Sequence, residues 1–234
     1  MDEKVKKTLV KASEGYAANT VLRATVQAIP YVGGPLDTLL AGKGAKVQFE
    51  RLEHFLSELS HRLERVESVP DIDEQALYDL SLDAMEKSIR ARLAEKRVLY
   101  ANVVARHVIQ ARKVDESEMA LRIIADLDLI HLEILRETLH APTCDEPFSG
   151  LKVVAISERA SIKAGEGKKG PVVLKERLHN WPLEALRYAA SELVSRGLLY
   201  DEGIGRWDIK AMEFLVPTDT AYWVDEWLSD PDVT

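Results

Sequence analysis

Two Glu-x-x-His pairs contain the residues of this chain best suited to bind a metal ion. The first pair is Glu58 and His61, and the second is Glu137 and His140. Di-iron sites in ferritin-like bundles use two such pairs, which project into the bundle core. At about 100° per residue, His61 points away from the apolar stripe of its helix, and Glu137 lies off the stripe of its own helix. We therefore interpret both pairs as solvated surface residues and predict no metal ion and no cofactor. The two stripes consist of Leu52, Leu56, Leu59 and Leu63, and of Leu132, Leu135 and Leu139.

The sequence contains no recognisable nucleotide-binding loop or catalytic motif. Gly42-Lys43 lacks the following hydroxyl residue that a phosphate-binding P-loop supplies to magnesium. The Gly-x-Ser-x-Gly and His-Glu-x-x-His patterns do not occur in the sequence. The one cysteine, Cys144, is followed by Asp145 and Glu146, whose negative charges raise a thiol pKa and disfavour a reactive thiolate. We therefore predict a non-enzymatic protein without catalytic residues.

The net charge and the cysteine content bear on nucleic-acid binding and on the cellular location of the protein. The 234 residues carry a net charge of -8. Residues 1–120 hold 18 Lys+Arg against 19 Asp+Glu, whereas residues 121–234 hold 13 against 20. An acidic second half opposes broad, charge-driven binding to nucleic acid. A single cysteine excludes an internal disulfide framework, and together with the lack of an apolar run of about 18 residues it predicts a cytoplasmic protein.

Helical periodicity and turn residues predict a mainly α fold with three domains. Residues 1–45 form an amphipathic helical hairpin with a glycine- and proline-rich corner, and residues 46–125 form an antiparallel helical bundle. Residues 126–234 begin with a helix and continue with a β-branched strand and a short helix. A longer helix from Pro182 to Gly197, a small β-hairpin and a final helix follow. This order is typical of a winged helix-turn-helix domain.

The N-terminal hairpin also raises a membrane alternative. Residues 17–41 contain only Arg23 and Asp37 as charged residues. Each arm of the hairpin has about 8–14 residues, which is shorter than a membrane-spanning helix requires. An intramolecular or dimer-forming corner therefore fits the pattern better, and membrane contact through the apolar hairpin remains the alternative.

Several short motifs resemble a group of uncharacterised bacterial helical proteins. The motifs are AIPYVGGPLDTLL, EKRVLYANVVARHV, DLIHLEILRETLHAP and LVSRGLLYDEGIGRWD. Proteins of this group have an Ile-Pro-x-x-Gly-Gly corner, a helical domain and a C-terminal winged-helix-like domain. The resemblance covers most of the chain and implies this architecture without implying a chemistry. Some similar sequences lie among prophage and phage-defence genes.

The predicted winged-helix-like domain contains the candidate residues for binding nucleic acid. Eight basic residues form this set: Lys163, Lys168, Lys169, Lys175, Arg177, Arg187, Arg206 and Lys210. The longer helix turns its apolar side inward, which leaves Glu184, Tyr188, Ser191 and Ser195 outward and Arg187 and Glu192 on the flanks. One arginine between two glutamates matches a phosphate-lined major groove poorly, and Asp201, Glu202 and Asp208 around the hairpin would repel the phosphate backbone.

These patterns favour a regulatory or adaptor protein that uses the winged-helix-like module to bind a protein partner. One alternative is a DNA-binding transcriptional regulator that uses the basic residues above. Another is a membrane-active effector of the phage-defence type that acts through the N-terminal hairpin. The heptad-like apolar pattern of residues 46–67 adds a homo-oligomer to the candidate assemblies.

Overall fold

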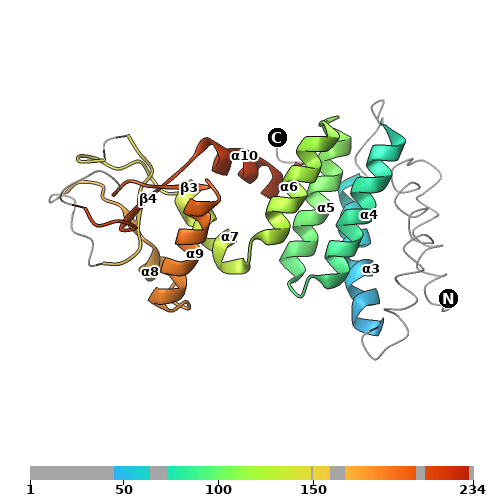
Figure 1. Cartoon of the computed structure of the whole chain (residues 1–234), viewed down its shortest axis with the longest axis horizontal. Coiled ribbons are helices and arrows are strands. Elements are labelled where there is room, and N and C mark those ends of the chain that lie inside the picture. Colours follow the sequence, from blue (N-terminus) through green and yellow to red (C-terminus); the bar gives the residue numbers. More distant parts are fainter. Residues whose placement is uncertain (1–44, 64–72, 149, 159–166, 204–208, 232–234) are drawn as a thin grey trace. The chain divides into compact units, whose positions relative to one another are not determined.

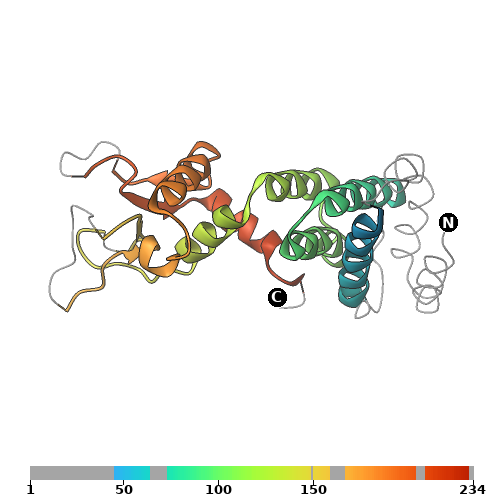
Figure 2. The ribbon, with the colours of Figure 1, turned by 90° about the horizontal axis from the view of Figure 1, so that it is seen from below.

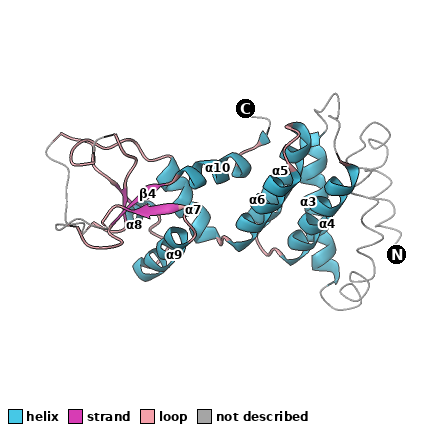
Figure 3. Cartoon of the chain, turned by 45° about the horizontal axis from the view of Figure 1, so that its top comes forward, coloured by secondary structure: helices cyan, strands magenta, loops and turns pink. Residues whose placement is uncertain are grey.

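The computed structural model describes residues 45–63, 73–148, 150–158, 167–203 and 209–231 (Figure 1). Within these ranges the chain is mainly helical and contains one small four-stranded sheet, which confirms the predicted fold class at this level (Figure 3). The predicted hairpin of residues 1–45 lies outside the described residues except for its last position. The described chain divides into two compact units. The first comprises Met1–Asp126 and Trp227–Thr234, and the second comprises Leu127–Glu226.

Four helices make up the described part of the first unit (Figures 1 and 2). They are α3 (Ala45–Leu63), α4 (Glu74–Arg90), α5 (Ala94–Ile109) and α6 (Val114–Asp126). Helix α4 begins at Asp73, whose carboxylate accepts hydrogen bonds from the backbone N–H groups of Gln75 and Ala76 at 3.0 and 3.2 Å. Helix α5 is buried without interruption from Leu99 to Val108, so it forms the centre of this bundle.

The apolar stripe of α3 is buried within its own unit. Leu52, Leu59 and Leu63 are buried as predicted, but Phe55 is fully buried where the heptad-like pattern placed Leu56, which is half-buried. A helix that packs against two neighbours buries a wider stripe than a two-stranded coiled coil does, and this draws Phe55 into the core. The stripe is therefore covered within its own unit and does not require a second copy of the chain to bury it. The homo-oligomer remains a prediction.

The end of the chain belongs to the first unit, whereas the predicted third domain included it. Trp227 is fully buried, and the carbonyl oxygen of Ser229 accepts hydrogen bonds from Asn102 Nδ2 at 3.3 Å and from Arg106 Nη2 at 3.2 Å. The guanidinium of Arg112 lies 5.8 Å from the centre of the Trp227 ring. These contacts with α5 and with the start of α6 explain the placement of residues 227–231, and helical periodicity alone does not reveal them.

The second unit combines helices with the sheet (Figures 1 and 3). Its elements are α7 (Leu129–Leu139), β1 (Val154–Ala155), β2 (Val172–Val173), α8 (Leu174–Arg177), α9 (Leu183–Ser195), β3 (Leu199–Asp201), β4 (Phe214–Pro217) and α10 (Asp219–Leu228). The strand order is β2-β1-β4-β3, in which β1 pairs with β2 in parallel and β4 runs antiparallel to both β1 and β3. The last residues of α10, Trp227 and Leu228, are those that group with the first unit.

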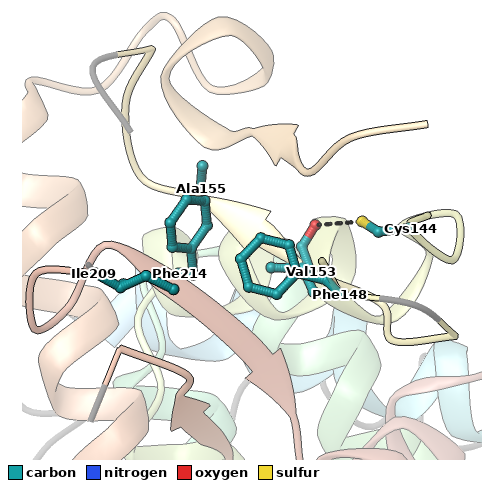
Figure 4. Close-up of a cluster of buried hydrophobic side chains, with 6 residues drawn as sticks. All are labelled: Cys144, Phe148, Val153, Ala155, Ile209 and Phe214. Carbon is teal, nitrogen blue, oxygen red and sulfur yellow. Dashed lines mark hydrogen bonds between the residues drawn. The ribbon is translucent and has the colours of Figure 1, made fainter. Parts of the chain in front are cut away.

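A hydrophobic cluster fixes the sheet against the loop that precedes β1 (Figure 4). It consists of Cys144, Phe148, Val153, Ala155, Ile209 and Phe214. The rings of Phe148 and Phe214 lie with their centres 4.8 Å apart at an interplanar angle of 49°. Cys144 is buried, and its thiol lies 4.0 Å from the carbonyl oxygen of Val153.

Candidate interaction surface

Helix α9 lies at the surface of the second unit, with one side buried and the other exposed. Pro182 occupies its N-cap position, and Gly197, with φ at +72°, follows its C-terminal end, as the sequence predicts. Its inner side is buried through Leu186, Ala189, Ala190 and Leu193. This burial fixes the rotation of the helix and therefore determines which side chains face solvent.

The opposite side of α9 presents one aromatic ring among small and charged side chains. We define the α9 face as Glu184, Arg187, Tyr188, Ser191 and Ser195, all of which are exposed. Tyr188 is 67% exposed, the highest value among the large hydrophobic residues of the described chain. The hydroxyl groups of Ser191 and Ser195 donate to carbonyl oxygens of α9 itself, at 2.7 and 2.8 Å. Both hydroxyl protons are therefore used within the helix.

A histidine–glutamate pair connects α9 to α7. His131 Nδ1 accepts a hydrogen bond from the backbone N–H of Asp128 at 3.0 Å, which leaves Nε2 to donate to Glu192 Oε2 at 2.9 Å. His131 is only 4% exposed. Glu192 is therefore a positioning residue for α9 and contributes little to the outward surface. In the sequence, Asp128 and His131 have the spacing of a residue pair at a helix start. The contact of His131 with Glu192, 61 residues away, leaves no local sequence pattern.

Lys175, predicted to contact nucleic acid, is used inside the turn between α8 and α9. Its ammonium group donates to the carbonyl oxygens of His179 at 3.0 Å and Trp181 at 2.7 Å. Trp181 in turn donates its indole N–H to the carboxylate of Glu133 on α7. Two of the three ammonium donors of Lys175 are thus committed to holding the turn.

Asp201 also has a different role from the predicted one. It is 2% exposed, and its carboxylate accepts hydrogen bonds from the backbone N–H groups of Gly203 at 2.9 Å and Met212 at 2.7 Å. It therefore anchors both ends of the loop between β3 and β4 instead of facing a phosphate backbone. A Cβ atom on Gly203 would lie 2.5 Å from the carbonyl oxygen of Lys210, so only glycine fits there.

The remaining basic candidates come from separate segments. Lys168 and Lys169 are exposed in the loop before β2, Arg177 is exposed on α8, and Lys210 is exposed between β3 and β4. Strands β2 and β3 form the two edges of the sheet, so the segments that carry these lysines join it at opposite edges. Lys163, Arg206 and the acidic Asp208 lie outside the described residues. The basic residues that the structure describes therefore do not lie on one element.

The two Glu-x-x-His pairs make local contacts. Glu58 accepts from Arg62 at 2.7 Å, and His61 is exposed. Nδ1 of the exposed His140 lies 2.9 Å from the carbonyl oxygen of Arg136. Within the described residues no group of three or more His, Cys, Asp or Glu side chains is arranged to hold a metal ion.

Cys144 has a raised pKa, as predicted, although the main cause differs. Burial raises the pKa of the thiol, and the negative charge of Asp145 raises it further, whereas the contact with the Val153 carbonyl acts in the opposite direction. The acidic neighbour was visible in the sequence, but the burial arises from the cluster with Phe148. The thiol is thus held in its unreactive form.

Comparison with protein-family models, with curated proteins and with solved structures finds no match to this chain. No helix among the described residues has both the length and the apolar character needed to cross a membrane. The predicted membrane contact concerns residues 17–41, which lie outside the described residues.

Proposed function

We propose that the second unit is a winged helix-turn-helix-like module and that the chain is a non-enzymatic regulatory or adaptor protein. The order α7, β1, β2, α8, α9, β3 and β4 supports this proposal because, apart from the two-residue strand β2, it follows the element order of that fold. The sheet pairing supports it further, since β4 lies between β1 and β3. In this scheme α9 is the second helix of the turn motif and the Asp201-anchored loop is the wing.

The exposure of Tyr188 is the observation that favours a protein as the partner of this module. Its ring is exposed near the middle of the α9 face, between one arginine and one glutamate. Tyrosine and arginine are enriched at protein interfaces, and tyrosine is a frequent hot-spot residue because it offers a large apolar area with few rotatable bonds. A nearly neutral face with an exposed aromatic ring matches a protein surface better than a phosphate backbone.

The charge of the unit favours a protein partner over DNA. Residues 127–226 hold 12 Lys+Arg against 17 Asp+Glu. Binding to DNA depends on neutralising several phosphates, and the α9 face offers Arg187 against Glu184. DNA binding remains the second candidate because Lys168, Lys169 and Lys210 are exposed and available for backbone contacts.

A comparative pull-down tests the proposal. The full chain, Tyr188→Ala and the matched control Tyr200→Ala serve as baits, since Tyr200 is also an exposed tyrosine, 49% exposed on β3. We expect a specific protein that wild type and Tyr200→Ala retain and Tyr188→Ala loses. Identical recovery with all three baits would contradict a docking role for the α9 face.

A parallel titration with duplex DNA tests the second candidate function, DNA binding, independently of protein binding. A DNA binder should show affinity that falls steeply with salt and that weakens when Lys168 and Lys169 are neutralised. If the protein instead shifts no duplex at low salt, DNA contact is rejected and the protein-binding proposal stands on the pull-down alone.

A further inference from the structure

The turn between α4 and α5 in the first unit gathers two guanidinium groups on the same backbone segment. Arg51 on α3 donates from Nη1 to the carbonyl oxygens of Ile89 at 3.0 Å and Arg90 at 3.4 Å. Arg97 on α5 donates from Nη1 to the carbonyl oxygens of Ala91 at 2.9 Å and Arg92 at 3.4 Å. Two side chains that lie 46 positions apart in the sequence thus meet at four consecutive residues.

Two further arginines extend from the same turn. Arg90 ends α4, Arg92 lies between the helices, and both are exposed, whereas Arg51 and Arg97 are half-buried. We call these four residues the arginine cluster. Burial lowers the pKa of Arg97, and the nearby positive charge of Arg51 lowers it further.

The arginine cluster lacks the carboxylate partners that other basic side chains of this unit have. Four such side chains pair with an acid one helical turn away: Lys46 with Glu50, Arg62 with Glu58, Lys87 with Asp83, and Arg112 with Glu116. Throughout the described ranges, no ion pair joins a member of the arginine cluster to a carboxylate. Among the described residues, no ion pair therefore neutralises the charges of the arginine cluster.

The donors of the arginine cluster are only partly used. Each guanidinium has five N–H donors, and the contacts of Arg51 and Arg97 to the turn use Nη1 alone. Capping the last carbonyl groups of α4 accounts for these contacts, but it does not account for Arg90 and Arg92. The remaining donors suit an oxyanion, since planar guanidinium groups bind phosphate oxygens in pairs.

The start of α5 adds to the positive potential at this turn. Its N-cap residue is Leu93, whose side chain makes no capping hydrogen bond, so the helix dipole adds positive potential there. Glu95 in the first turn of α5 is the acidic residue that opposes it. On α4, Glu86 lies one helical turn before Arg90, so the four arginines outnumber the two carboxylates on these segments.

We propose that the arginine cluster binds a phosphate group, either of a soluble phosphate compound or of a lipid headgroup. Arg51 and Arg97 form the floor of the site, held by the carbonyl groups of the turn. In this proposal the exposed Arg90 and Arg92 supply further guanidinium donors to the phosphate. This site belongs to the first unit and is separate from the α9 face.

Calorimetric titration of the full chain with inorganic pyrophosphate at constant ionic strength tests the site. We expect saturable binding that weakens about tenfold or more in the double variant Arg90→Gln/Arg92→Gln, because two charge-assisted contacts are lost. Both residues are exposed, so the variant is expected to fold. Arg122→Gln, which removes an exposed arginine of α6, is the matched control and should bind like wild type.

Vesicle flotation distinguishes the two sources of phosphate. Wild type and the two variants are compared on vesicles that contain phosphatidic acid and on vesicles of phosphatidylcholine alone. Flotation only with phosphatidic acid, lost in the double variant, supports a lipid headgroup, whereas pyrophosphate binding without flotation supports a soluble ligand. The proposal is overturned if pyrophosphate and phosphatidic acid both fail to bind, or if Arg122→Gln weakens binding as much as the double variant does.

Discussion

The arginine cluster of the first unit and the α9 face of the second unit use charged residues in opposite ways. In the second unit, Asp201 and Glu192 accept hydrogen bonds that hold the loop between β3 and β4 and helix α9 in place. The surface they position is nearly neutral and contains an exposed tyrosine. In the first unit, Arg90 and Arg92 are exposed, and neither forms an ion pair with a described carboxylate. Charged side chains therefore hold backbone groups in both units, and the first unit in addition exposes two arginines that we propose for ligand binding.

The largest expected effect comes from removing the carboxylate of Asp201, which anchors the loop between β3 and β4. Asp201→Ala should lower the free energy of unfolding by about 3 kcal/mol or more, because two buried backbone N–H groups lose their acceptor. Urea denaturation measures the change. The neighbouring Glu202→Ala is the control and should change stability by less than about 1 kcal/mol; equal losses in both variants would show that the carboxylate of Asp201 does not hold the loop.

The buried hydroxyl of Tyr100 in the first unit should make the free energy of unfolding depend on pH. Burial, followed by the negative charges of Asp83 and Asp126, raises the pKa of Tyr100 to about 12. A raised folded-state pKa means that stability is complete below the ordinary value of about 10 and is lost as pH rises through about 12. Wild type should therefore lose about 2–3 kcal/mol more than Tyr100→Phe over this range. Parallel denaturation curves at each pH would contradict this account.

The hydrogen bond between His131 on α7 and Glu192 on α9 should contribute less to the free energy of unfolding than Asp201 does. His131→Ala removes the bonds to Asp128 and Glu192, and we expect a loss of about 2 kcal/mol in urea denaturation. Glu192→Gln keeps an acceptor for the histidine and should lose about 1 kcal/mol or less. A larger loss in Glu192→Gln than in His131→Ala would show that the charge, and not the hydrogen bond, holds α9.

The smallest expected change in stability compares an arginine of the arginine cluster, Arg92, with an arginine of the α9 face, Arg187. Arg92→Gln should raise the free energy of unfolding by a few tenths of a kcal/mol, because it relieves repulsion within the arginine cluster. Arg187→Gln on the α9 face should leave stability unchanged within about 0.5 kcal/mol. Thermal unfolding at low ionic strength detects the difference, and added salt should remove it. A loss of stability in Arg92→Gln would mean that Arg92 has a structural role.

Local sequence patterns predicted the parts of the molecule that depend on neighbouring residues. Pro182 and Gly197 marked the ends of α9, and the outward position of Tyr188 followed from helical periodicity. The acidic residue beside Cys144 gave the correct direction of its pKa. Each of these features depends on residues within about two helical turns.

Long-range packing determined the features that the sequence did not reveal. The burial of Asp201 depends on a loop that returns to it at Met212, and the role of Lys175 depends on the carbonyl groups of the turn beyond α8. The arginine cluster needs Arg51 of α3 to reach the end of α4. A list of basic residues predicts charge, but it does not predict which charges the fold uses.

The affinity of the full chain for the protein recovered in the pull-down tests the central claim most directly. Calorimetry would compare wild type, Tyr188→Ala and Tyr200→Ala. We expect Tyr188→Ala to bind about 30-fold more weakly, as for a hot-spot residue, and Tyr200→Ala to bind within about twofold of wild type. Equal affinities of wild type and Tyr188→Ala would contradict the assignment of the α9 face as the docking surface.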